Sequence, residues 1–485
     1  MSRFHGILSS RRLTRLGSLA AVCLLTPVMH GAPAVRPNIV VCIADDLGWE
    51  ESSPYGNPVV STPHLQRIAR EGMRFDRFML TASSCSPSRS SMFSGRYPHN
   101  TGAMNLHTDM KPSVELFIEP MRATGYHTML IGKSHGTNHP EVVKKFDRME
   151  KADWGRPWTM GDMWERALRE RPPDRPFLLW AASIDPHRPY RQGTHAQPHD
   201  PAKVVVPPYL PDTPEIRSDL ADYYDEIARF DEHVGRLLRV LSEQGVLDQT
   251  VVLVISDNGR AYPHSKTRVN LPGIKSPLLV RYPKLVPAGS VAPGLVSAVD
   301  LAPTILELAN ARPLAKTDGT SFVPILRDPA QRIRTAAFAE HNWHNYMAFE
   351  RAVITETHVY VRNWLPELPA SPPGEVVPLP FYQEMRRSFE AGTLPAAFAD
   401  TFLKPRPPEE LFDTARDPHC QHNLATDPFS SPVRQELERE LLAWQERTGD
   451  AFPSRAQLKP DDIDRRTGTP LRKDSGGKRS TPEKN

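Results

Sequence analysis

The chain has 485 residues, of which 39% are hydrophobic and 24% are charged, and its formal net charge is +3. Four of the positive charges lie in residues 1–34 and a net four lie in residues 451–485, so the body between them has a net charge of −5. This negative body argues against a nucleic-acid partner, and its length is sufficient for one large α/β domain and a smaller one.

The first 34 residues have the pattern of a signal peptide. The segment has a basic start, an apolar run from Leu16 to Val28 and small residues near its end. The run is too short to favour a membrane span, and no later segment is apolar enough to form one. We therefore expect the protein to be exported to the periplasm or the extracellular space, and the pair Arg11-Arg12 also allows a twin-arginine route.

Strands and helices alternate along residues 35–332. Apolar runs that are typical of strands buried on both faces occur at 38–44, 127–131, 177–184, 251–256 and 277–281. Helical patterns with start and stop signals occur at 62–72, 112–124, 215–241 and 301–309. The alternation predicts an α/β fold with a mostly parallel central sheet flanked by helices.

The pattern changes after about residue 333. Short strands are predicted at 336–340, 348–355 and 358–362, and a covering helix is predicted at 432–447. Residues 333–450 are therefore predicted to form a smaller C-terminal α+β subdomain with an antiparallel sheet. Residues 366–380 are rich in proline and are predicted to be a loop. Residues 451–485 are rich in Lys, Arg, Asp, Gly and Pro, so a disordered basic tail is predicted there.

Polar side chains follow four of the predicted strands, in the pairs Asp45 and Asp46, Lys133 and His135, Asp185 and His187, and Asp257 and Asn258. Each pair alone is explained by a turn or a helix cap. Active sites of open α/β sheets, however, collect at the carboxyl ends of the strands. Four such pairs in one sheet therefore predict a shared site at that edge.

Four of these side chains have the chemistry of a cation site. Asp45, Asp46 and Asp257 offer carboxylates and Asn258 offers an amide oxygen, a set that suits a hard divalent cation such as Ca²⁺ or Mg²⁺. The sequence has no Cys/His cluster with zinc spacing. We expect Arg89, Lys133 and Lys266 to face an anionic substrate beside the cation, and His135 and His187 to move protons.

Three cysteines follow the signal peptide, too few for a disulfide framework. Cys85 begins the string Cys85-Ser86-Pro87-Ser88-Arg89, which matches the C-x-P-x-R signal that a modifying enzyme reads when it oxidises the thiol to an aldehyde, formylglycine. The hydrated aldehyde carries two hydroxyls on one carbon, so one can attack sulfur while the other remains to expel the product. The alternative is a loop cysteine that precedes a turn and a helix start.

The longer run Cys85–Arg96 resembles the sulfatase signature C-x-P-S-R-x-x-x-x-T-G, with Ser94 in place of threonine. Over residues 36–450 the chain resembles type I sulfatases of the alkaline-phosphatase superfamily. The resemblance implies an alkaline-phosphatase-like fold with Ca²⁺ on Asp45, Asp46, Asp257 and Asn258. It also implies a formylglycine nucleophile at Cys85, steadied by Arg89, and contacts to the sulfate or the leaving group from Lys133, His135, His187 and Lys266. A formylglycine-generating enzyme or an anaerobic sulfatase-maturating enzyme is then an expected partner.

Within the family, several stretches are similar to heparan N-sulfatases (sulfamidases): Cys85–Arg89 with Asn105–His107, Val206–Pro214, Asp300–Leu306 and Glu340–His344. This likeness implies that His341, Trp343 and His344 belong to the sugar pocket. One position departs from it, because Lys266 stands where sulfamidases have arginine and O-sulfatases usually have lysine. Arginine and lysine are not interchangeable at an oxyanion site, so the choice between N-sulfate and O-sulfate stays open.

We therefore expect a sulfohydrolase that removes sulfate from a sulfated sugar or a glycosaminoglycan-type glycan, with N-sulfoglucosamine as one candidate substrate. The alternative in the same superfamily is a formylglycine-dependent phosphonate monoester or phosphodiester hydrolase. A third hypothesis is a non-enzymatic sulfoglycan-binding protein, which follows if Cys85 is never oxidised.

Overall fold

The computed structural model describes residues 36–193 and 195–471, which belong to one compact unit. The predicted signal peptide lies outside the described residues. The boundary predicted at residue 332 stays a prediction, since both of its sides belong to the same compact unit. No helix of the described ranges is long and apolar enough to cross a membrane.

Nine strands of the described chain form the central sheet, in the order β4-β3-β5-β1-β6-β8-β2-β7, with β9 paired to β2. The parallel core consists of β1 (Asn38–Ala44), β3 (His127–Gly132), β4 (Arg148–Lys151), β5 (Phe177–Ala182) and β6 (Thr250–Ser256). The remaining strands are β2 (Met73–Met79), β7 (Lys275–Ser276), β8 (Leu278–Arg281) and β9 (Ser290–Ser297). The predicted mostly parallel sheet is confirmed, and β8 is antiparallel to both of its neighbours.

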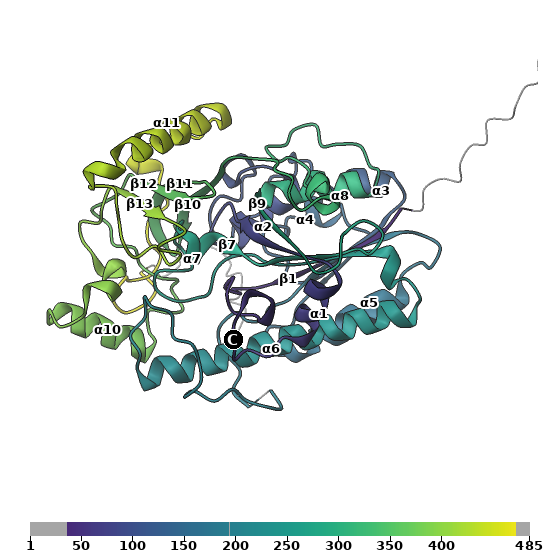
Figure 1. The fold of residues 1–485 in the computed structure, drawn as a ribbon, viewed down its shortest axis with the longest axis horizontal. Coiled ribbons are helices and arrows are strands. Elements are labelled where there is room, and N and C mark those ends of the chain that lie inside the picture. The colour runs from purple at the N-terminus through teal and green to yellow at the C-terminus, as the bar shows by residue number, and fades with distance from the viewer. Residues whose placement is uncertain (1–35, 194, 472–485) are drawn as a thin grey trace, which may run out of the picture. The chain divides into compact units, whose positions relative to one another are not determined.

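Helices cover both faces of this sheet because its strands are apolar on both faces. Side chains of one face, such as Val40 and Cys42, pack with α1 (Pro63–Glu71), α5 (Met160–Glu170) and α6 (Pro214–Glu243). Side chains of the other face, such as Val41 and Ile43, pack with α2 (Cys85–Ser94), α3 (Ile118–Ala123) and α8 (Leu301–Leu308). Figure 1 shows α1, α5 and α6 on one side of the strands and α2, α3 and α8 on the other. The shorter helices are α4 (Pro140–Val143), α7 (Leu271–Ile274) and α9 (Val323–Arg327).

Helix α6 carries a buried carboxylate that caps a neighbouring helix. Asp231 is 1% exposed and accepts hydrogen bonds from the backbone N–H groups of His64 (3.1 Å) and Leu65 (2.7 Å) in the first turn of α1. These N–H groups have no partner within their own helix, so the carboxylate satisfies donors that would otherwise be unpaired.

We expect Asp231→Ala to lower the free energy of unfolding by about 2–4 kcal/mol, because it leaves two buried N–H groups without an acceptor. Urea unfolding of the variant measures this loss as a shift of the midpoint. Asp231→Asn keeps one acceptor oxygen and should lose less. Equal midpoints for the alanine variant and the unaltered protein would show that the cap contributes nothing.

The second sheet is antiparallel and consists of β10 (Ala337–His344), β11 (Tyr346–Ile354), β12 (His358–Asn363) and β13 (Glu409–Asp413). Helix α11 (Ser431–Thr448) covers one face, where Leu437, Leu441 and Trp444 pack with side chains of these strands. The predicted C-terminal α+β group is therefore confirmed. The proline-rich loop leads from β12 to α10 (Pro380–Glu390).

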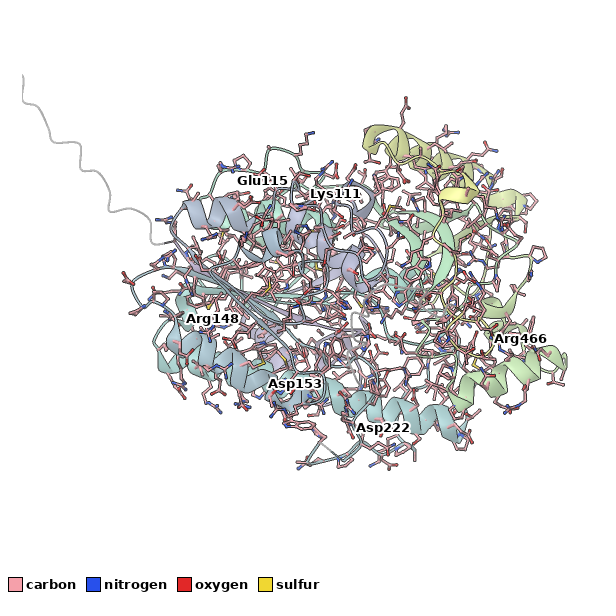
Figure 2. The ribbon with its side chains drawn as sticks, turned by 180° about the vertical axis from the view of Figure 1, so that it is seen from behind. Lys111, Glu115, Arg148, Asp153, Asp222 and Arg466 are labelled. Carbon is pink, nitrogen blue, oxygen red and sulfur yellow. The ribbon has the colours of Figure 1, made fainter. Side chains whose placement is uncertain are left out.

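The C-terminal segment, residues 459–471, corrects the prediction of disorder from residue 451 onward. Pro460 O accepts a hydrogen bond from Trp343 Nε1 at 2.9 Å, Asp461 forms an ion pair with Arg465 at 2.6 Å, and Ile463 packs against the core. Arg466 pairs with Glu390 of α10, and Figure 2 shows its side chain beside that helix. The prediction was wrong for residues 451–471 because amino-acid composition does not show which charged side chains form ion pairs and hydrogen bonds in the folded chain. Residues 472–485 lie outside the described part.

Candidate active site

The four predicted cation ligands lie together because their strands are neighbours. Strands β1 and β6 are parallel and end in register, with Ala44 opposite Ser256. Asp45 and Asp46 therefore leave the sheet beside Asp257 and Asn258. All four side chains are fully buried.

Backbone contacts hold this group in place. The Asp46 N–H donates to Asp257 Oδ1 at 3.2 Å, and the Asp46 carbonyl accepts a hydrogen bond from the Tyr223 hydroxyl at 2.9 Å. Asp46 has a φ of 71°, in the left-handed region that side chains other than glycine adopt at a cost. Asn258 Nδ2 donates to Asp46 Oδ1 at 2.6 Å. Strained backbone conformations of this kind, held in place by neighbouring hydrogen bonds, are common at functional sites.

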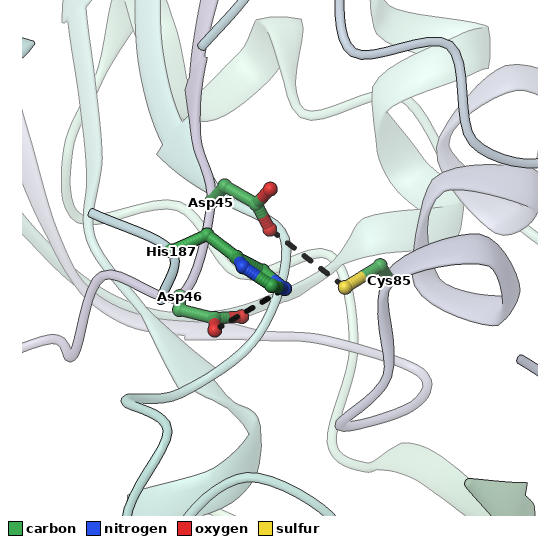
Figure 3. A group of neighbouring side chains, drawn as sticks. All are labelled: Asp45, Asp46, Cys85 and His187. Atoms are coloured by element: carbon green, nitrogen blue, oxygen red, sulfur yellow. Dashed lines mark hydrogen bonds and ion pairs between the residues drawn. The ribbon is translucent and has the colours of Figure 1, made fainter. Parts of the chain in front are cut away.

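Cys85 is the first residue of α2, and its Sγ lies 3.7 Å from Asp45 Oδ1. Figure 3 shows its side chain converging with those of Asp45, Asp46 and His187. Burial raises the pKa of the Cys85 thiol far above its usual range, although Lys133 and Lys266 act in the opposite direction. An unmodified thiol here stays protonated at neutral pH and is a poor nucleophile.

Each of the three carboxylates has its own buried cation. Lys133 Nζ lies 2.5 Å from Asp45 Oδ2, Lys266 Nζ lies 2.8 Å from Asp46 Oδ1, and Arg89 Nε lies 2.8 Å from Asp257 Oδ2. Arg89 Nη2 is buried and has no hydrogen-bond partner within the described ranges. The site therefore holds positive groups beside the Cys85 thiol. Arg89 Nη2 remains available to donate a hydrogen bond to an oxygen atom of a bound group.

The two predicted histidines lie at the rim of this group. His187 Nε2 is 3.9 Å from Asp46 Oδ2, and burial lowers the pKa of His187 to about 4 although Asp46 opposes the shift. Burial and then Lys133 also hold the pKa of His135 well below its usual range. Its Nδ1 has no hydrogen-bond partner in the part of the chain that the structure describes. Both imidazoles are thus neutral at pH 7 and able to accept a proton.

A cavity of about 1110 Å³ opens onto these residues. Its walls include five of the predicted catalytic residues: Cys85, Lys133, His135, His187 and Lys266. Sequence reasoning missed other wall residues: Asp219 from α6, and His107, Trp154, Tyr190, Glu375 and Ile463 from segments between the helices and strands. His107 stands in a stretch that resembles sulfamidases, whereas the other five carry no motif.

The three predicted sugar-pocket residues lie at different positions relative to the cavity. His344 lines the cavity, and its Nδ1 lies 2.8 Å from Ser84 Oγ. Trp343 lies behind the cavity wall, packed against Cys85 and Leu106. The structure does not bring His341 to this cavity, because it lines a small separate pocket with Glu350 and Arg406.

The residues fit a hard cation. Asn258 Oδ1 is a buried oxygen without a hydrogen-bond partner among the described residues. Burial, together with the nearby Asp257 and Asp46 carboxylates, raises the pKa of Asp45 to about 8 although Lys133 and Arg89 oppose the shift. A cation would satisfy the amide oxygen and remove the repulsion between the carboxylates. The oxygen-rich donor set suits Ca²⁺ or Mg²⁺ better than zinc.

Comparisons with known proteins agree with this geometry. The Sulfatase family model matches residues 37–311, and a model described as N-sulphoglucosamine sulphohydrolase, C-terminal, matches residues 264–364. The chain is 31% identical to human N-sulphoglucosamine sulphohydrolase, over 89% of this chain and 94% of that protein. It is 27% identical to an ulvan-active sulfatase of Formosa agariphila, over 86% of this chain and 76% of that protein.

Solved structures share the fold. One, a complex with its substrate D-glucosamine-2-N,6-O-disulfate, has a TM-score of 0.67 at 19% identity and covers 87% of this chain and 100% of that one. The phosphonate monoester hydrolase of Agrobacterium radiobacter has a TM-score of 0.64 at 17% identity and covers 85% of this chain and 96% of that one. At these identities the likeness concerns the fold alone.

Proposed function

Because the chain belongs to the sulfatase family, we propose that it is an exported, Ca²⁺-dependent hydrolase that removes sulfate from a sulfated sugar of glycosaminoglycan type. The observation that carries the proposal is the position of Cys85, which lies at the cavity beside Asp45 and the three buried cations. Export rests on the predicted signal peptide, residues 1–34.

Two groups supply the chemistry that ordinary side chains lack. Asp45, Asp46, Asp257 and Asn258 would hold Ca²⁺, which as a Lewis acid draws charge from a sulfate oxygen when bound. Residue 85, once oxidised to formylglycine by a formylglycine-generating or an anaerobic sulfatase-maturating enzyme, supplies a nucleophilic hydroxyl.

The remaining roles belong to Arg89, which is buried outside the cavity wall, and to side chains of the wall itself. Lys133, Lys266 and Arg89 bind the sulfate oxygens and stabilise charge that grows on them during the reaction. His187 or Lys266 assists the departure of the leaving atom; of the two, Lys266 carries the proton at pH 7, since the lowered pKa of His187 leaves its imidazole neutral. His135 accepts the proton from the remaining hydroxyl of residue 85, a role supported by its neutral state at pH 7 and by its Nδ1, which has no hydrogen-bond partner among the described residues.

N-Sulfoglucosamine is the candidate substrate that the human relative and the match to the C-terminal sulphohydrolase model support. Lys266 in place of arginine favours an O-sulfate instead. The phosphonate monoester or phosphodiester alternative is supported only by a shared fold.

Release of inorganic sulfate from defined substrates tests the function. The matured full-length enzyme should release sulfate from N-sulfated or O-sulfated glucosamine, or from heparan fragments. We expect kcat/KM for these substrates to exceed that for a phosphodiester or a phosphonate monoester by on the order of 100-fold, since the site's charges are set for one kind of anion. Faster turnover of the phosphorus substrates would favour the alternative function.

A further inference from the structure

One carboxylate of the cavity wall touches the proposed sulfate-binding machinery. Glu375 Oε1 lies 3.2 Å from Lys266 Nζ, and the Glu375 side chain is 29% exposed toward the cavity. Burial alone would raise the pKa of Glu375, but Lys266, His187 and His344 hold it well below its usual range. The carboxylate is therefore charged and close to the groups that face the leaving atom.

The other acids of the wall already have partners. Asp109 accepts a hydrogen bond from the Asn138 N–H at 2.9 Å, Asp219 accepts one from Arg188 Nη1 at 2.8 Å, and Asp222 accepts one from Gln192 Nε2 at 2.8 Å. None of the three forms an ion pair with Lys133 or Lys266. Glu375 is thus the wall acid, among the described residues, that combines an exposed face with contact to a sulfate-binding lysine.

The C-terminal segment fixes the position of Glu375. The Gly374 N–H donates to Asn345 Oδ1 at 3.1 Å, and the Asp462 N–H donates to the Asn345 carbonyl at 3.1 Å. A β-carbon on Gly374 would collide with Ile463 Cδ1, so the loop and the segment pack without a gap. The carboxylate is held by packing as well as by Lys266, which suits a residue that must recognise a substrate atom.

A charged carboxylate cannot contact a sulfate oxygen favourably, because both are anionic. It can accept a hydrogen bond from the leaving side of the substrate, and here the two classes of sulfated sugar differ. The bridging oxygen of a sulfate ester has no hydrogen, whereas the bridging nitrogen of a sulfamate carries one. Hydrogen bonds to a charged acceptor are among the strong ones in proteins.

The leaving groups of the two classes of substrate also differ in charge. When the S–N bond breaks, nitrogen keeps the bonding pair and takes a proton to leave as R–NH₂, which takes a second proton from water. The overall reaction is R–NH–SO₃⁻ + H₂O → R–NH₃⁺ + SO₄²⁻. A carboxylate stabilises the positive charge that protonation places on the nitrogen, and an alcohol, which leaves as neutral R–OH, offers no such charge.

We infer that Glu375 is the residue that discriminates a leaving nitrogen from a leaving oxygen and makes this enzyme favour sulfamates, the N-sulfated amino sugars, over sulfate esters. The inference rests on the proposed sulfohydrolase function. In this account Glu375, rather than an arginine at position 266, provides the preference for an N-sulfate.

The test compares kcat/KM for sulfate release from D-glucosamine N-sulfate and from D-glucosamine 6-O-sulfate, with matured full-length enzyme. Glu375→Gln keeps the size of the side chain and removes its charge. We expect the ratio of the N-sulfate value to the O-sulfate value to fall by about tenfold to a hundredfold, the effect of one charged hydrogen bond. Glu375→Asp keeps the charge and should give an intermediate ratio.

Glu367→Gln is the matched control, since it removes the same charge from the same loop. Glu367 pairs with exposed Arg455 and does not line the cavity, so its ratio should equal that of the unaltered enzyme. Thermal unfolding of each variant checks that the fold is kept. An unchanged ratio in Glu375→Gln, even with both activities reduced, overturns the inference and leaves Glu375 as a support for Lys266. Sulfate release from neither sugar by the unaltered enzyme would overturn the proposed function itself.

Discussion

We expect Cys85→Ala to abolish sulfate release while the protein stays folded. The methyl side chain cannot be oxidised to an aldehyde, so the cavity keeps its cations but has no nucleophile. We expect kcat to fall on the order of 10⁴-fold or more, as for removal of a nucleophile that acts in concert with other groups. The rate of sulfate release under saturating substrate, measured beside a thermal unfolding curve, checks both parts of the prediction.

Cys420→Ala is the matched control, because Cys420 is 2% exposed and lies outside the cavity wall. Its loss removes a buried thiol of the same kind and should cost stability without a large change in kcat. Turnover in Cys85→Ala that equals turnover in Cys420→Ala would refute the assignment of the nucleophile.

The second large effect concerns the cation. Removal of divalent metal by a chelator should abolish activity and lower the midpoint of thermal unfolding, and Ca²⁺ should restore both. Without the ion, Asp45, Asp46 and Asp257 are buried side by side, and Asn258 Oδ1 lacks a partner. An ion that binds only the folded state adds about 4 kcal/mol of stability at 1,000 times its dissociation constant.

Asp257→Asn tests the same site within the chain. It removes one carboxylate charge and should weaken Ca²⁺ affinity by on the order of 100-fold, because hard cations depend on anionic oxygen ligands. Asp231→Asn makes the same substitution at another buried carboxyl group, in the contact between α6 and α1, and should leave the Ca²⁺ requirement unchanged. Full activity in protein that elemental analysis shows to be free of metal would exclude the cation role.

The ends of β1 and β6 could be predicted from the sequence because a buried parallel strand has a clear pattern. With residues 38–44 and 251–256 predicted as strands of one parallel sheet, Asp46 and Asn258 are expected to leave the sheet at one edge, as they do. The signature at Cys85 then supplied the nucleophile. Both patterns are local in the sequence. The regular geometry of a parallel sheet then determines where the residues that follow its strands lie.

Glu375 and Ile463 could not be predicted, since neither stands in a motif or follows a strand. Their places depend on contacts between segments far apart in sequence, such as Gly374 against Ile463. The predicted helix 112–124 is helical only at Ile118–Ala123. The antiparallel direction of β8 is likewise invisible in a short apolar run, because strand direction depends on the connection rather than on the residues.

The most direct test of the account is intact-peptide mass spectrometry of the segment that contains Cys85, from enzyme purified with its maturation system. We expect the mass of an aldehyde or its hydrate at residue 85, in the same preparation that releases sulfate. An active preparation in which residue 85 is entirely an unmodified thiol would contradict the mechanism, and an inactive one would favour a protein that only binds sulfated glycans.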